Sequence, residues 1–368
     1  MQDILKKIEN IISENIKDVD VSKLHADESL IDQGLDSLVR TDILISIGEV
    51  FDVELVDIDE SIVASLNKIA SFIKEQKGES LERELPKEFK SPKSVLNRES
   101  LVVGLKKIGV KAGDVLLVHS DLFSLGQLEY KSADENLDLI YNSFMEVLGT
   151  SGTLLVPAYY YEYGRWENPY DIKRSETSKE LGAFSKFVTR KSESKRSLHP
   201  LTALAGSGKL AEYITSGECG TSYGVDSAWD RFYESDGKML FLGVDLRSMT
   251  FIHYVEHRVG VPHIYNKLHS TPVFRDGEEV KIPICSSVRF LDFDIAYNKY
   301  KFTEMFKKAG LVNEYEIGTS VSYFVKSREI FKFLVKELNK DFYYLLKNKP
   351  NFRQNQIPMD GKAGAARE

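Results

Sequence analysis

Asp114-Val115-Leu116-Leu117-Val118-His119 is an apolar run whose length and β-branched residues predict a buried strand. A helical pattern over residues 97–108 precedes it. The same alternation recurs downstream, with helices expected over 135–148, 181–189 and 249–259 and apolar strands over 153–157 and 238–243. Because helices and apolar strands alternate, we expect an α/β layered domain, with later antiparallel strands within 272–284 and 314–325.

The first part of the chain has a different, wholly helical pattern. Apolar residues recur at helical spacing over 1–16, 37–51 and 63–77, which predicts an all-α bundle of three or four helices. Residues 78–95 are charged and carry two prolines, as is typical of a linker. The expected organisation is a helical domain over 1–77, a linker over 78–95, an α/β domain over 96–345 and a flexible tail over 346–368.

Composition and charge narrow the class of protein. The chain has 368 residues, 42% of them hydrophobic and 29% charged, and no run approaches the length of apolar sequence that a membrane span needs. The first residues form no apolar signal core, so we expect a cytoplasmic protein with no membrane partner. Residues 1–78 hold a surplus of Asp and Glu and the remainder is near neutral, which argues against nucleic acid as a partner. Cys219 and Cys285 provide neither a disulfide framework nor a metal knuckle.

One motif of the helical part suggests a covalent attachment point. In Ile31-Asp32-Gln33-Gly34-Leu35-Asp36-Ser37-Leu38, the serine stands at the expected start of a helix after a glycine loop, where an enzyme could reach its hydroxyl. The alternative is a serine that only caps the helix. With its acidic helical surroundings, the segment resembles an acyl carrier protein over residues 1–77. That resemblance implies 4′-phosphopantetheine on Ser37, a phosphopantetheinyl transferase to attach it, and an acyl-loading enzyme as a further partner.

Five motifs of the α/β part support a second resemblance. They lie at 118–126, 152–157, 196–203, 223–229 and 242–256, and the third contains Arg196-Ser197-Leu198-His199-Pro200. In this order they resemble the aminoglycoside 3-N-acetyltransferase family. The resemblance covers about 97–340 and implies an N-acyltransferase domain that moves an acetyl group from coenzyme A to an amine, in a fold distinct from the common acetyltransferase fold.

The residues also point to a catalytic pair. An amine attacks a thioester only when it is deprotonated, so the reaction needs a general base. His253 and Glu256 have the i, i+3 spacing of one helix face, and a carboxylate beside an imidazole orients the ring. We therefore expect His253 to be the base and Glu256 its partner, without a covalent acyl-enzyme. The alternatives are a surface ion pair or a zinc site, but no further ligands at metal spacing support zinc, so we expect no metal.

Other candidates flank this pair. His199, before a proline, is expected either to support catalysis or to serve structure. His119, Ser120 and Ser124 follow the first strand, where ligands often bind, and by resemblance they hold the pantetheine and pyrophosphate part of the donor. Resemblance also places Tyr223, Asp226 and Ser227 in the substrate pocket.

Tyr159 opens an aromatic segment over 159–174 that suits a sugar or heterocycle, or packs as a lid. This segment has equal numbers of acidic and basic residues, which indicates an acceptor less cationic than an aminoglycoside.

The sequence thus predicts an N-acyltransferase that transfers an acyl group from a pantetheine thioester to a primary amine. The donor is the fused carrier or an acyl-CoA such as acetyl-CoA, and delivery across a homodimer remains open. The acceptor is an amino sugar, a nucleotide-linked sugar or a secondary-metabolite intermediate. The alternatives are an acetyl-CoA-dependent aminoglycoside 3-N-acetyltransferase of antibiotic resistance, and a catalytically silent module that only docks the carrier.

Overall fold

The computed structural model divides the chain into two compact units, residues 1–89 and 90–368. It describes residues 2–15, 24–28, 30, 33, 43, 44, 47, 48, 50, 51, 53, 65–77, 95–130, 132–290, 293 and 295–352. Ser37 and the rest of its motif except Gln33, nearly all of the expected linker, and residues 353–368 of the expected tail lie outside the described residues.

Most of the described part of the first unit is helical. Helix α1 (Gln2–Asn15) and helix α3 (Leu66–Lys77) contact each other. Between them in sequence, residues 43, 44, 47, 48, 50 and 51 are also helical. Isoleucines at 8, 12, 43, 47, 69 and 73 are buried in one cluster, as the helical spacing of the apolar residues predicts. These elements form a helical core, and the carrier identity of the unit remains a prediction.

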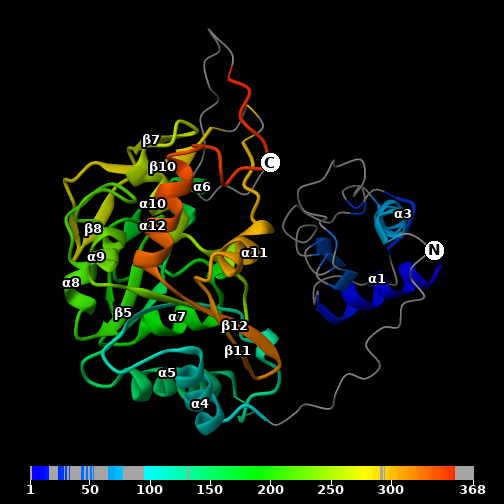
Figure 1. Cartoon of the computed structure of the whole chain (residues 1–368), viewed down its shortest axis with the longest axis horizontal. Helices are drawn as coiled ribbons and strands as arrows, with labels where there is room; N and C mark the ends of the chain where they lie inside the picture. Colours follow the sequence, from blue (N-terminus) through cyan, green and yellow to red (C-terminus); the bar gives the residue numbers. More distant parts are fainter. Residues whose placement is uncertain are drawn as a thin grey trace. The chain divides into compact units, whose positions relative to one another are not determined.

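A seven-stranded mixed sheet organises the second unit (Figure 1), which agrees with the α/β prediction. At its centre β1 (Val115–Ser120) pairs in parallel with β2 (Thr153–Pro157) and β6 (Lys238–Leu242). Antiparallel strands flank these three on both sides. They are β11 (Asn313–Ile317) and β12 (Ser320–Lys326) beyond β6, and β5 (Leu204–Gly208) and β4 (Lys195–Arg196) beyond β2.

Helices cover both faces of the sheet. Successive side chains of the central strand β1 point to opposite faces, so each face contributes to a different hydrophobic cluster. Leu116 and Val118 face a cluster formed with α4 (Arg98–Ile108), α5 (Ala133–Leu148) and α7 (Gly182–Arg190). Leu117 faces a second cluster formed with α9 (Ala228–Glu234), α10 (Phe251–Val259) and α12 (Ser327–Leu338). Helices α4 and α5 pack together, as do α10 and α12 (Figure 1).

Shorter elements complete the second unit. The remaining strands are β3 (Tyr170–Asp171), β7 (Ile264–His269), β8 (Val273–Arg275), β9 (Glu278–Glu279) and β10 (Ile284–Arg289). The remaining helices are α6 (Glu162–Trp166), α8 (Ala211–Thr215) and α11 (Lys301–Lys308). Single 3₁₀ turns occupy Phe123–Leu125, Lys179–Leu181 and Leu246–Ser248.

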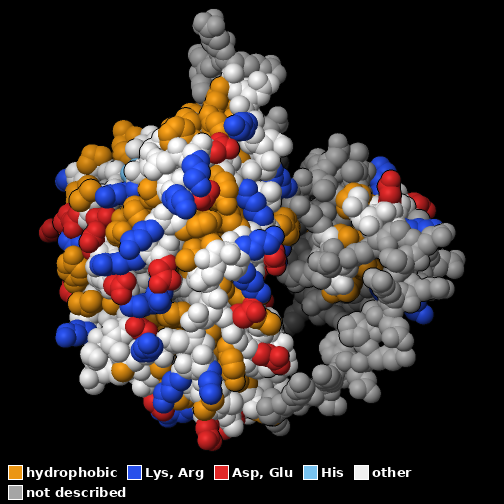
Figure 2. Space-filling model, in the orientation of Figure 1, with side chains coloured by type: hydrophobic (Ala, Val, Ile, Leu, Met, Phe, Trp, Pro, Cys, Tyr) orange, Lys and Arg blue, Asp and Glu red, His pale blue; other side chains and the backbone are white. Residues whose placement is uncertain are grey.

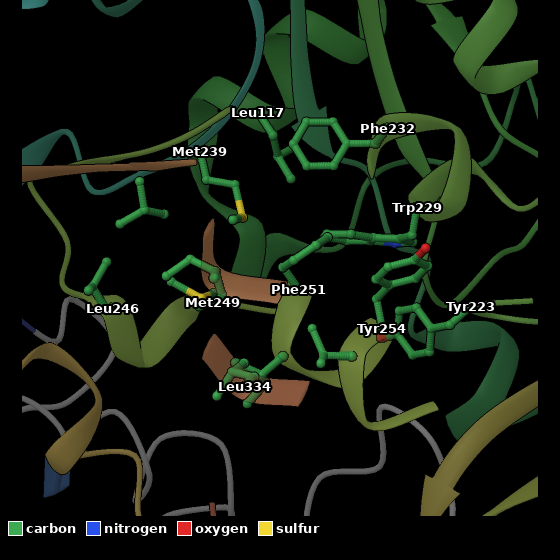
Figure 3. Packing of buried hydrophobic residues seen from close by; sticks show 14 of the residues in the cluster. Leu117, Tyr223, Trp229, Phe232, Met239, Leu246, Met249, Phe251, Tyr254 and Leu334 are labelled. Atoms are coloured by element: carbon green, nitrogen blue, oxygen red, sulfur yellow. The ribbon is translucent and has the colours of Figure 1, made fainter. Parts of the chain in front are cut away.

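Trp229 lies at the centre of the cluster around α10 (Figure 3). Its side chain is fully buried, its ring packs against Phe232, Phe251 and Tyr223, and its indole N–H donates to the carbonyl oxygen of Thr202 at 2.9 Å. Tyr223 and several residues of α10 belong to this core, so its packing positions the side chains that α10 carries.

The surface carries charges of both signs. Figure 2 shows basic and acidic side chains interspersed with hydrophobic ones over the visible face of the second unit. No helix among the described residues is long and apolar enough to cross a membrane.

Candidate active site

Helix α10 places His253 and Glu256 one turn apart. The helix ends at Gly260, whose left-handed backbone (φ 77°) lets its N–H donate to the carbonyl oxygen of Glu256 at 2.9 Å. Nδ1 of His253 lies 2.9 Å from Oε2 of Glu256. A carboxylate can only accept, so Nδ1 carries the proton.

Glu256 accepts hydrogen bonds from two more residues, although its side chain is fully buried. Nε2 of His263 lies 3.0 Å from Oε1, and the Tyr297 hydroxyl donates to Oε2 at 2.8 Å. Burial alone would raise the pKa of Glu256, but the hydrogen bonds from His253 and His263 outweigh it and lower that pKa to about 2. The carboxylate therefore stays ionised at any working pH.

His253 is the partly exposed member of this cluster. Its side chain is 33% exposed, and its ring packs edge-on against Tyr297, with centroids 5.1 Å apart, and at a tilt against Tyr223 at 6.5 Å. With the proton on Nδ1, the lone pair on Nε2 is available to accept a proton. Chemically, the arrangement fits a general base whose orientation is fixed by a buried carboxylate.

His199 has both ring nitrogens engaged within the protein. Nε2 lies 3.2 Å from the carbonyl oxygen of Cys285 and therefore donates, and Nδ1 lies 3.0 Å from the Thr202 hydroxyl. Burial lowers the pKa of His199 to about 3. A small cavity borders the ring and is also lined by Cys219 and Ser222. Nε2 also lies 3.4 Å from the hydroxyl of Ser222, the residue before Tyr223, so both ring nitrogens of His199 are engaged within the protein.

The buried state of His199 predicts a pH-dependent stability. An unfolded imidazole gains a proton as the pH falls below about 6.5, whereas folded His199 does so only near pH 3. The contribution of neutral His199 to the free energy of unfolding is thus fully present above pH 6.5. It is lost as the pH falls, and at pH 5 the free energy of unfolding is lower by about 2 kcal/mol. We expect His199→Gln to lose correspondingly less stability than wild type between pH 7.5 and 5. Urea unfolding followed by tryptophan fluorescence tests this, and an identical pH dependence would contradict it.

The sequence predicts that His119, Ser120 and Ser124 all follow the first strand, but β1 extends to Ser120, so only Ser124 lies in the loop after it. His119 is buried and stacked on Phe241 (5.0 Å, 3°), and burial lowers its pKa to about 4. Ser120 ends the strand and is half-buried. The hydroxyl of Ser124 lies 2.6 Å from the carbonyl oxygen of Gly243, which ties this loop to the end of β6.

The predicted substrate residues divide into two groups. Tyr223 is buried beside His253, and Tyr159, also buried, packs against Tyr161 at 5.8 Å. Asp226 and Ser227 bond within the protein instead. The Asp226 carboxylate accepts from Arg231 at 2.6 Å, and Ser227 caps α9 by accepting from the Asp230 N–H.

His263 and Tyr297 were not among the sequence candidates. His263 follows the turn at Gly260, and Tyr297 lies 41 residues from Glu256 in a segment without a helical or strand pattern. No spacing rule connects them to Glu256, so only the folded chain reveals the contact. Among the described residues, no group of three or more His, Cys, Asp or Glu side chains is arranged to hold a metal ion.

Comparison with known proteins gives one consistent family. The aminoglycoside 3-N-acetyltransferase family matches residues 117–339. Aminoglycoside N(3)-acetyltransferase III of Serratia marcescens is 27% identical over 268 residues, which cover 66% of this chain and 97% of the relative. Aminoglycoside N(3)-acetyltransferase IV of a Salmonella species is 30% identical over 246 residues, which cover 66% and 88%.

Solved structures agree. The apoenzyme of the aminoglycoside acetyltransferase AAC(3)-IVa matches with a TM-score of 0.57 and 26% identity, over 69% of this chain and 93% of that chain. The binary complex of AAC-IIIb with CoASH matches with a TM-score of 0.59 and 25% identity, over 70% of this chain and 100% of that chain. The family match includes every candidate residue of the second unit and leaves Ser37 outside it.

Proposed function

Because the chain belongs to the aminoglycoside 3-N-acetyltransferase family and is an N-acetyltransferase, we propose that it transfers an acyl group from a pantetheine thioester to a primary amine with His253 as general base. The observation that carries the proposal is the His253 imidazole, partly exposed and held through Nδ1 by the buried carboxylate of Glu256.

The transfer is a direct displacement. Nε2 of His253 takes a proton from the attacking amine, whose nitrogen forms the new bond to the thioester carbonyl carbon. The carbon–sulfur bond breaks, and the thiol leaves after receiving a proton. Glu256 remains a carboxylate throughout and stabilises the imidazolium that forms on His253.

For the donor, we propose acetyl-CoA or a similar acyl-CoA bound by the last residues of β1, His119 and Ser120, and by the loop after it, which contains Ser124. The relative crystallised with CoASH supports a coenzyme A thioester. A fused carrier is the second donor in the proposal. The Ser37 motif favours it. The composition of residues 78–95 predicts a linker of about 18 residues, and a random coil of that length would span roughly 20 to 25 Å and supply the arm at about millimolar effective concentration.

For the acceptor, the names of the relatives favour an aminoglycoside. The charges around the site favour an amine with fewer positive charges, such as an amino sugar. Glu256 is occupied by three donors, Asp226 pairs with Arg231, and Asp230 accepts from Tyr254. These three carboxylates are engaged within the protein, so in this proposal none of them pairs with an ammonium group of the acceptor.

A donor experiment tests the proposal. We expect wild type and Ser37→Ala to release thiol equally fast from free acetyl-CoA with an amine acceptor, tried as gentamicin and as a mono-amino sugar. After coexpression with a phosphopantetheinyl transferase, only chains that keep Ser37 should gain the mass of the arm and transfer an acyl group loaded on it. Ser71→Ala, an exposed serine of α3, is the matched control. If Ser37→Ala, treated in the same way, formed as much amide as loaded wild type, carrier delivery would be eliminated. If wild type released no thiol from any donor, the acyltransfer proposal would be eliminated.

A further inference from the structure

We propose that His263 and Tyr297 are positioning residues, which hold the Glu256 carboxylate in the one orientation that keeps His253 ready to accept a proton. The inference rests on the proposed function of His253. It adds two residues that act through Glu256 and do not touch the substrate.

The Glu256 carboxylate is fully buried. Its side chain has no exposed surface, and a buried carboxylate is costly unless hydrogen bonds replace its water. His253 alone supplies one donor. His263 and Tyr297 supply two more, at 3.0 and 2.8 Å, so the charge is stabilised by the fold before any substrate binds.

The three hydrogen-bond donors divide between the two carboxylate oxygens of Glu256. Oε1 receives the bond from His263, whereas Oε2 receives those from Tyr297 and His253. Because both oxygens are held, the carboxylate cannot rotate about its terminal torsion without breaking a bond. Oε2 therefore stays directed at Nδ1 of His253, which fixes the tautomer of that ring and leaves Nε2 without a proton.

The surroundings of His263 leave Glu256 as its polar partner. Its ring is fully buried, and Nδ1 has no hydrogen-bond partner among the described residues, so Glu256 is the polar group to which this side chain is directed. Its ring also packs near Tyr297 at 6.1 Å and Tyr343 at 6.0 Å. A buried histidine with one engaged nitrogen would be a poor choice for packing alone, because an apolar residue would avoid the unmatched atom.

Tyr297 is held in place by backbone pairing with residues 345–347. Residues 296 to 298 pair with the chain near Leu346, through bonds from Asn298 N–H to Leu345 and from Lys347 N–H to Ala296. The hydroxyl that reaches Glu256 is thus anchored by the C-terminal part of the second unit. The positioning of His253 depends on segments far apart in sequence.

The test compares Tyr297→Phe, His263→Leu and His263→Gln. We expect the first two to lower kcat about tenfold and to change the KM for acetyl-CoA less than twofold, because they disturb His253 and not donor binding. The glutamine amide can still donate to Oε1, so His263→Gln should recover most of the lost kcat. Tyr343→Phe is the matched control, since its ring packs beside His263 and no contact joins it to Glu256.

A second readout does not depend on turnover. Nitrogen-15 chemical shifts report the fraction of His253 with its proton on Nδ1, and we expect this fraction to fall in Tyr297→Phe and His263→Leu and to stay at its wild-type value in Tyr343→Phe. Unchanged kcat and unchanged tautomer in folded Tyr297→Phe and His263→Leu would overturn the proposal. If wild type transfers no acyl group and the tautomer still shifts, the proposed function fails while the positioning role stands.

Discussion

Replacing His253 by alanine is expected to lower kcat for acyl transfer by about a thousandfold, within the range that loss of a general base produces. The amine would then have to lose its proton to water. The KM for acetyl-CoA should change little, because we assign donor binding to the end of β1 and the loop after it. Steady-state kinetics with acetyl-CoA and a primary amine measure both quantities. The fold should persist, since the side chain is partly exposed.

Two comparisons sharpen this prediction. Glu256→Gln keeps the shape of the side chain but removes its charge, so the imidazolium on His253 loses its stabilising partner and kcat should also fall by at least tenfold. His269→Gln is the control, because His269 bonds to Ser286 and shares no partner with Glu256. If His253→Ala kept more than a tenth of wild-type kcat, His253 could not be the base. No turnover by wild type with any donor would instead favour a silent docking module.

The sheet could be predicted from the sequence wherever a strand is buried on both faces. The apolar runs at 115–120, 153–157 and 238–242 are the three parallel strands, and their residues face helices on both sides. The predicted helix over 249–259 begins two residues later, because a 3₁₀ turn occupies Leu246–Ser248 first.

Strand β5 illustrates what the sequence could not predict. Leu204-Ala205-Gly206-Ser207-Gly208 has too few large apolar residues to be recognised as a strand. The structure gives the reason for its small residues. A Cβ on Gly206 would lie 1.9 Å from the carbonyl oxygen of Leu154 in β2, so no larger residue fits.

The same contrast holds at the site. A spacing of three residues on a helix predicts contact between His253 and Glu256, because the helix geometry alone brings them together. The contacts of His263 and Tyr297 depend on the turn at Gly260 and on pairing near Leu346. Local patterns carry no information about such contacts, whose partners meet only after the second unit has folded.

Replacing Trp229 by alanine is expected to cost about 3 to 5 kcal/mol of unfolding free energy, because it leaves a large cavity in the core of the second unit. Trp229→Phe fills much of that space but leaves the Thr202 carbonyl without its donor, so we expect a smaller loss of about 1 to 3 kcal/mol. Urea unfolding measures both. Trp166→Phe is the matched control, since that side chain is 72% exposed and its replacement should shift stability by less than about 0.5 kcal/mol.

The Trp229 variants should also lower activity, which links the core to the site. Trp229 packs against Tyr223 with ring centroids 6.1 Å apart, and Tyr223 in turn packs against His253 at 6.5 Å (Figure 3 shows the first pair). If Trp229 moves or is truncated, Tyr223 loses its support and the ring of His253 loses a neighbour that restricts it. We therefore expect kcat of folded Trp229→Phe to fall several-fold while Trp166→Phe retains wild-type kcat. Wild-type kcat in a destabilised Trp229→Phe would show that Glu256 alone orients His253, with no contribution from the packing of Tyr223.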